Sequence, residues 1–154
     1  MIVLMILGLG VAVVVIVAAK MSGAGGAVSV PAAVLLFSGD GEYSFKIVGE
    51  SYRQDDLAQL AGGRTEDGVH LETLAELAPE ASNPHDANAV AVTIGGRQVG
   101  YLSRSDAVQY RTRFGSQRAM CNAMIAGGWD RGPDDVGLFG VRLDIDEDWS
   151  TIGP

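Results

Sequence analysis

The sequence predicts a mainly β fold with two short helices, arranged as a small β-barrel that follows one transmembrane helix. The β prediction comes from several short segments rich in β-forming residues that alternate with turn residues, a spacing typical of small barrels and sandwiches. The transmembrane prediction comes from one uninterrupted apolar run near the N-terminus. A length of 154 residues leaves room for one compact domain with appendages.

The apolar run extends from Ile2 to Ala19. As a helix it would be roughly 27 Å long, close to the roughly 30 Å of a bilayer core. A cleavable signal peptide is the alternative, but such peptides carry positive charge before a shorter apolar segment. Here the first charge is Lys20, after the run. We therefore expect residues 1–20 to be a retained single-pass anchor in the lipid bilayer of the cell membrane, with the soluble domain in the cytoplasm.

Residues 21–42 are expected to form a flexible linker and a second apolar segment. Ser22 to Ala27 contains only small uncharged residues, which favours a flexible spacer. Val30 to Phe37 is apolar but too short to span a bilayer as a helix. It is either an added strand or a segment that lies near the membrane surface.

The soluble domain is expected to cover residues 43–147, with residues 148–154 as a C-terminal tail. Its predicted strands are Ser44 to Glu50, Val69 to Glu76, Ala89 to Ile94, Gln98 to Leu102, Ala119 to Ala126 and Val136 to Ile145. The pair Gly95-Gly96 predicts a tight hairpin between the third and fourth strands, because glycine reaches the positive φ that primed turns require.

Two short helices are predicted between these strands. The first covers Leu57 to Ala61, with Asp55 or Asp56 as its N-cap and a glycine after its end. The second is capped by Ser103 or Ser105 and extends to the residue before another glycine, at about position 114.

The second helix lies in a locally basic window of an acidic protein. The chain has a formal net charge of -8, yet Asp106 is the only acid in this window. Its arginines are Arg97, Arg104, Arg111, Arg113 and Arg118. A local basic patch on an acidic protein predicts weak nucleic-acid binding that depends strongly on salt.

The most informative motif is Asn83-Pro84-His85-Asp86-Ala87-Asn88-Ala89-Val90, followed by Val99-Gly100-Tyr101-Leu102. The Asn-Pro pair predicts a turn, and the residues after it predict a strand. With Phe45 to Tyr52 before them and Ser103-Arg104 after them, these blocks resemble the HIRAN domain in order and spacing. The resemblance implies a small OB-like β-barrel.

Related HIRAN domains bind single-stranded DNA with a preference for a free 3′ end, so the resemblance implies a non-catalytic nucleic-acid-binding module. Tyr52 matches a family position that stacks on a base. Asp86 matches the acid that accepts a hydrogen bond from the terminal hydroxyl, and Arg104 matches a phosphate contact. The full set of expected nucleic-acid-binding residues is Tyr52, Asn83, His85, Asp86, Tyr101, Arg104 and Arg111.

The chain departs from the best-known DNA-binding member of that family at three positions. His85 replaces a tyrosine, which gives a smaller stacking surface, and Ser51 replaces an arginine that contacts phosphate. Tyr101 replaces a histidine. These differences weaken the case for tight DNA binding and leave the fold expectation unchanged.

The same residues have structural alternatives. Tyr52 could close the barrel as a core residue, since an aromatic side chain near a strand end is usually buried. Asn83 and Asp86 could do no more than bond backbone amides in a turn. Arg104 could be the exposed start of a helix. Under these alternatives the protein would be a membrane-tethered module that binds a protein partner, for example by strand addition at an exposed sheet edge.

Catalytic and metal chemistry have no motif in this chain. It lacks a phosphate loop of the Gly-x-x-x-x-Gly-Lys-Ser/Thr type, a Cys-x-x-Cys pair and a recognisable pair of nucleophile and base. We therefore expect no cofactor, no metal and no enzymatic activity. Cys121, the single cysteine, is expected to be a buried and inert strand residue.

Overall fold

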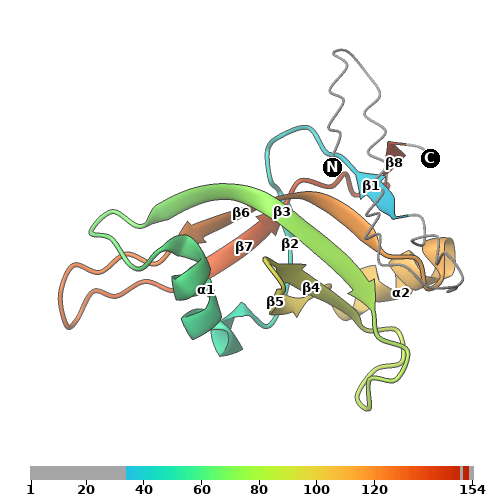
Figure 1. Cartoon of the computed structure of the whole chain (residues 1–154), viewed down its shortest axis with the longest axis horizontal. Helices are drawn as coiled ribbons and strands as arrows, with labels where there is room; N and C mark the ends of the chain where they lie inside the picture. Colours follow the sequence, from blue (N-terminus) through green and yellow to red (C-terminus); the bar gives the residue numbers. More distant parts are fainter. Residues whose placement is uncertain (1–33, 150, 153–154) are drawn as a thin grey trace, which may run out of the picture.

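The computed structural model describes residues 34–149 and 151–152, which form one curled sheet with two helices and a short 3₁₀ turn (Figure 1). The strands are β1 (Leu35–Phe37), β2 (Phe45–Lys46), β3 (Val69–Pro79), β4 (Val90–Ile94), β5 (Arg97–Tyr101), β6 (Ala119–Gly127), β7 (Phe139–Leu143) and β8 (Thr151–Ile152). The helical elements are η1 (Glu50–Tyr52), α1 (Gln54–Ala61) and α2 (Arg104–Phe114). A mainly β fold with two helices is therefore confirmed.

The expected transmembrane helix and most of the expected linker lie outside the described residues. Among the residues that the structure does describe, no helix combines the length and the hydropathy needed to cross a bilayer. The described end of the apolar stretch, Leu35–Phe37, is the strand β1.

The sheet has the strand order β2-β7-β6-β3-β4-β5, with β1 paired to β6 and β8 paired to β1. Its two ends approach each other, because Val48, just after β2, bridges to Tyr101 in β5. Each of these two residues donates its amide to the other's carbonyl at 2.9 Å. The sheet therefore curls into a half-barrel, in agreement with the expected OB-like architecture.

Alternating side chains of the curled strands form the core. In β6, Cys121, Ala123 and Ile125 are buried, whereas Asn122 between them is exposed. Helix α1 contributes Leu57, which is completely buried. The expectation of a buried Cys121 is confirmed.

A cluster of aromatic rings closes one end of this core. Trp149 packs edge-to-face against Phe37 of β1 and Phe45 of β2, with ring centroids 5.6 Å and 5.2 Å apart. It also packs against Tyr110 and Phe114 of α2, at 5.7 Å and 6.4 Å. Trp149 lies in the segment expected to be a tail, and only 3% of it is exposed.

The hairpin between β4 and β5 is confirmed: Gly95 and Gly96 have φ of 56° and 77°, and the two strands pair in antiparallel fashion. The prediction of a strand over Ser44 to Glu50 is wrong for the last part of that range. Gly49, with φ of 89°, turns the chain into η1, so the regular ladder contains only β2. The last strand is also shorter than expected, because its ladder with β6 covers only Phe139–Leu143.

Both helices are present, but their caps differ from one another. Helix α1 begins at Gln54, three residues earlier than expected, and no side chain caps it, so an aspartate cap was wrong. Asp55 and Asp56 instead lie inside its first turn, where a negative charge still favours the helix dipole. Ser103 caps α2, because its hydroxyl accepts the Asp106 amide at 3.2 Å, and Gly115 ends that helix.

Candidate nucleic-acid interface

The loop of residues 80–89 joins β3 to β4 and extends beyond the end of the sheet (Figure 1). Two side chains shape it. The Oδ1 of Asn83 accepts hydrogen bonds from the amides of His85 and Asp86, at 2.9 Å and 3.2 Å. The Oδ1 of Asp86 then accepts the amide of Asn88 at 2.8 Å. The expected turn role of Asn83 and Asp86 is therefore real, and it uses only one of the two Asp86 carboxylate oxygens.

Glu80 joins this loop to β5, a role that the sequence analysis missed. Its Oε2 accepts hydrogen bonds from the Nδ2 of Asn83 at 3.0 Å and from the hydroxyl of Tyr101 at 3.2 Å. The one signal in the sequence was a carboxylate three residues before Asn83, at the end of a strand. Its partner Tyr101 is distant in the sequence, so the contact could not be predicted from neighbouring residues.

An open depression of about 680 Å³ lies between the loop and β5. Residues 79–85 and Tyr101 line it. His85 is exposed at this depression, while Asn83 and Tyr101 are half-buried. Its chemistry combines an imidazole, a phenol and an amide with the carboxylate of Glu80.

Arg104, the first residue of α2, stands beside the loop. Its Nε lies 4.0 Å from the Oδ2 of Asp86, and 86% of the Arg104 side chain is exposed. At this separation the pair is an ion contact rather than a hydrogen bond, and solvent screens it strongly. The guanidinium therefore remains accessible to an anion next to Asp86.

Arg111 lies on the same face of α2, because positions seven apart return to one side of a helix. It is half-buried, and its guanidinium donates to the hydroxyl of Ser116 at 3.4 Å. Two helical turns, or roughly 10 Å, separate it from Arg104 along the axis. A ligand would need to extend along α2 to contact both.

The other arginines of the basic window do not join this surface as a continuous groove. Arg97 pairs with Asp56 at 2.7 Å, and Arg118 pairs with Glu76 at 2.6 Å. Arg113 donates to the backbone carbonyl of Asp148. The sequence shows only neighbouring charges, whereas the fold brings acids from distant segments to Arg97 and Arg118.

Tyr52 ends η1 and is 89% exposed, so the alternative of a core residue is wrong. Its side chain makes no hydrogen bond, ion pair or ring contact with any described residue. The segment that carries it reaches β5 through Val48, on the edge opposite β4. Strand β5 therefore lies between Tyr52 and the 80–89 loop.

The structure thus brings together most of the expected site residues. Those gathered at the loop are Asn83, His85, Asp86, Tyr101 and Arg104, with Tyr52 across β5 and Arg111 farther along α2. Among the described residues, no group of three metal-ligating side chains is close enough to hold an ion.

Burial, reinforced by the charge of Asp144, raises the pKa of the Cys121 thiol to about 12.

The family model described as the HIRAN domain matches residues 40–123 of the chain. This range contains the 80–89 loop, α2 and the start of β6, and it therefore includes all the candidate residues. Strands β1, β7 and β8 lie outside it. Neither the search of curated proteins nor the search of solved structures found a match.

Proposed function

Since the chain belongs to the HIRAN domain family, we propose that it is a non-catalytic module that binds nucleic acid, specifically single-stranded DNA or a 3′ end. The observation that carries the proposal is the pairing of Arg104 with Asp86, the residue after His85 of the loop depression. A strand terminus presents a hydroxyl donor close to a phosphodiester anion. A half-buried carboxylate next to an exposed guanidinium complements both groups.

The proposed contacts follow from which atoms the fold already uses. The turn occupies Oδ1 of Asp86, so Oδ2 is the atom that accepts the terminal hydroxyl. Asn83 holds the loop in shape, and His85 offers a ring for the last base. Arg104 binds the adjacent phosphate, with Arg111 farther along the strand. Tyr101 lines the site, and its hydroxyl donates a hydrogen bond to the carboxylate of Glu80.

Tyr52 serves as a second stacking surface for a base that passes over β5. Its ring is fully available in the free protein, so a base can stack on it without rearrangement of the core. Base–aromatic stacking contributes about 1 to 3 kcal/mol and tolerates any base. The proposed site therefore recognises an end rather than a sequence.

Affinity in this proposal is low and falls steeply with salt. The net charge of -8 repels nucleic acid at long range, and ion pairs already neutralise Arg97 and Arg118. The attraction is left to the few cations near the loop, whose effect is screened within roughly 10 Å at 0.1 M salt.

The membrane anchor is part of the same proposal. Support comes from the apolar run between Ile2 and Ala19 and from Lys20 after it, all of which lie outside the described residues. Anchoring predicts that the chain sediments with membranes and resists extraction by alkaline carbonate. Release by carbonate would overturn the anchor and leave the nucleic-acid proposal intact.

The test of the binding proposal is fluorescence anisotropy of the full chain in detergent micelles. The probes are single-stranded oligonucleotides of one sequence with a free or a phosphate-blocked 3′ end, at low and moderate salt. We expect binding at low salt, with higher affinity for the free end. Equal affinity for both ends would overturn end recognition, and no binding at low salt would overturn the nucleic-acid function.

A further inference from the structure

The first half of β3 has a free edge. Strand β3 pairs with β6 from Val69 to Leu77, but it pairs with β4 only from Glu76 to Pro79. Within the described part of the chain, residues 69–75 therefore have a strand on one side only, and Figure 1 shows this half of β3 extending past β4 and β5. A strand edge of this length presents unpaired backbone groups that another chain can bind.

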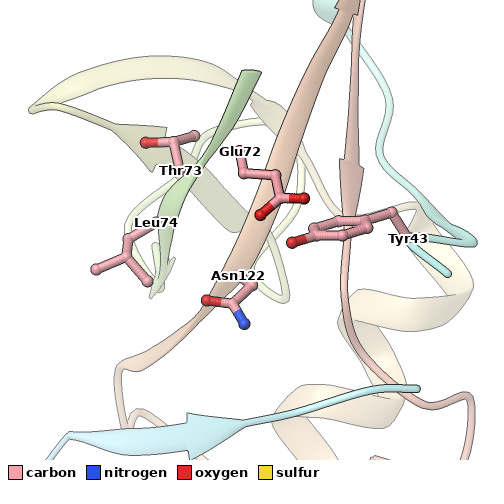
Figure 2. A pocket seen from close by; sticks show the side chains of 5 residues that line it. All are labelled: Tyr43, Glu72, Thr73, Leu74 and Asn122. Atoms are coloured by element: carbon pink, nitrogen blue, oxygen red, sulfur yellow. The ribbon is translucent and has the colours of Figure 1, made fainter. Parts of the chain in front are cut away.

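An open depression of about 430 Å³ lies on the sheet face over this half of β3 and the adjoining β6. Glu72, Thr73 and Leu74 of β3 line it together with Asn122 of β6 and Tyr43 from the loop before β2. Figure 2 shows the Glu72 carboxylate and the Tyr43 hydroxyl directed toward one another, with the Asn122 side chain beside them. None of these three polar groups has a hydrogen-bond or ion-pair partner in the described part of the chain.

A buried carboxylate holds the loop that carries Tyr43. The Oδ1 of Asp144, a carboxylate that is 6% exposed, accepts the amide of Gly41 at 2.8 Å. Tyr43 itself adopts a φ of 50°, a left-handed conformation that is unusual for a residue with a side chain. Such a backbone conformation persists where the surroundings impose it, so the fold sets the backbone at Tyr43.

Two carboxylates act on the Tyr43 phenol in this depression. Desolvation, the charge of Glu72 and the charge of Asp144 all raise the pKa of the Tyr43 phenol. The guanidinium of Arg142, on β7 beyond β6, donates to the carbonyl of Val141 and makes no ion pair with Glu72. A cationic side chain is therefore the group that complements this space.

We propose that the free edge of β3 binds an extended peptide segment of another protein that places a lysine or arginine side chain beside Glu72. Strand addition would satisfy the free backbone groups of residues 69–75. A side chain directly opposite Glu72 on the added strand would lie about 5 Å from it, within reach of the depression. Leu74, which is 56% exposed, then favours an apolar residue two positions away in the same segment.

A second copy of this chain fits the edge less well. Symmetric antiparallel pairing of two β3 edges about Glu72 would place two glutamates opposite each other, which is destabilising. The site also differs from the nucleic-acid site, which lies after the other end of β3 at Pro79. Its test is therefore independent of the test of DNA binding.

The experiment uses the isotope-labelled full chain in micelles and synthetic peptides as long as the free edge. The probe alternates threonine and valine around a central arginine, and its matched control has a central glutamate. We expect the arginine peptide to shift the amide signals of residues 69–75 and to bind about two- to fivefold more tightly than the glutamate peptide, the range for an exposed ion pair. Methylation of alternate peptide nitrogens should abolish binding, because it removes the strand hydrogen bonds.

Two protein variants assign the effect to Glu72. Glu72→Gln should remove the preference for arginine, whereas Asp55→Asn, which neutralises an exposed acid on α1, should keep it. The proposal is overturned by equal affinity for the two peptides, by amide shifts that spare residues 69–75, by binding that survives methylation, or by no binding at all.

Discussion

Gln54 and Phe139 are joined by two hydrogen bonds, one in each direction. The Phe139 amide donates to the Oε1 of Gln54 at 2.8 Å, and the Nε2 of Gln54 donates to the Phe139 carbonyl at 3.0 Å. Since β2 pairs only with the last two residues of β7, no described strand pairs with the first part of β7 on the edge away from β6. The carboxylate of Glu50 accepts the Val141 amide at 3.3 Å in the same way. Side chains of η1 and α1 thus replace a strand.

Gln54→Ala should therefore destabilise the fold more than an ordinary helix substitution. Removal of the amide leaves the N–H and C=O of Phe139 without partners, which costs about 1 to 3 kcal/mol of unfolding free energy. Gln59→Ala, at an exposed position of the same helix, is the control and should be nearly neutral. Urea denaturation measures both, and equal losses would contradict the strand-replacement role.

Arg104→Gln should weaken binding of single-stranded DNA and reduce its salt dependence. The loss of one phosphate contact should lower the slope of log affinity against log salt by about 0.7. Lys46→Gln on β2 removes the same charge from an exposed position outside the loop. Anisotropy titrations at several salt concentrations test this, and an equal change in both variants would show that only total charge matters.

Asp86 allows the turn role to be separated from ligand binding. Asn at this position keeps an oxygen for the Asn88 amide and loses the charge, whereas Ala loses both. We expect Asp86→Asn to keep the stability of the wild type and lose the preference for a free 3′ hydroxyl. Asp86→Ala should also lose about 1 kcal/mol of stability. Unchanged end preference in Asp86→Asn would assign Asp86 to the turn alone.

Trp149→Ala should destabilise the protein by about 3 to 5 kcal/mol, the usual cost of removing a large buried aromatic side chain. Its ring contacts β1, β2 and α2 at once, although it lies beyond the residues that the family model matches. Leu138→Ala, at a residue that is 61% exposed, serves as the control. Thermal unfolding measures both variants, and equal melting temperatures would show that the aromatic cluster contributes little to stability.

The Cys121 thiol should resist alkylation in the native protein at pH 8. Burial raises its pKa from 9.0 to about 12, so the reactive thiolate is scarce and also shielded. Because the folded pKa lies above the unfolded one, this thiol stabilises the fold fully below pH 9, and the contribution is lost as the pH rises toward 12. Mass spectrometry after iodoacetamide should show modification only in denaturant, and rapid native labelling would contradict the burial.

Features that depend on neighbours in the chain were predictable from the sequence. The Gly95-Gly96 hairpin, the Ser103 cap and the turn bonds of Asn83 and Asp86 involve residues at most a few positions apart, so local geometry and side-chain chemistry determine them. The family itself followed from the order and spacing of such local motifs, and the matching family model confirms it.

Features that join distant segments were decided only by the tertiary structure. The sequence shows Arg97 and Arg118 as a basic patch, but folding places Asp56 and Glu76 against them. The sequence places Tyr52 at the end of a predicted strand. In the structure the chain turns at Gly49 into η1, Glu50 of η1 contacts the edge of β7, and the Tyr52 ring is exposed. Which charges are neutralised and which strand edges stay free depends on contacts between residues tens of positions apart, because curling of the sheet brings those residues together in three dimensions.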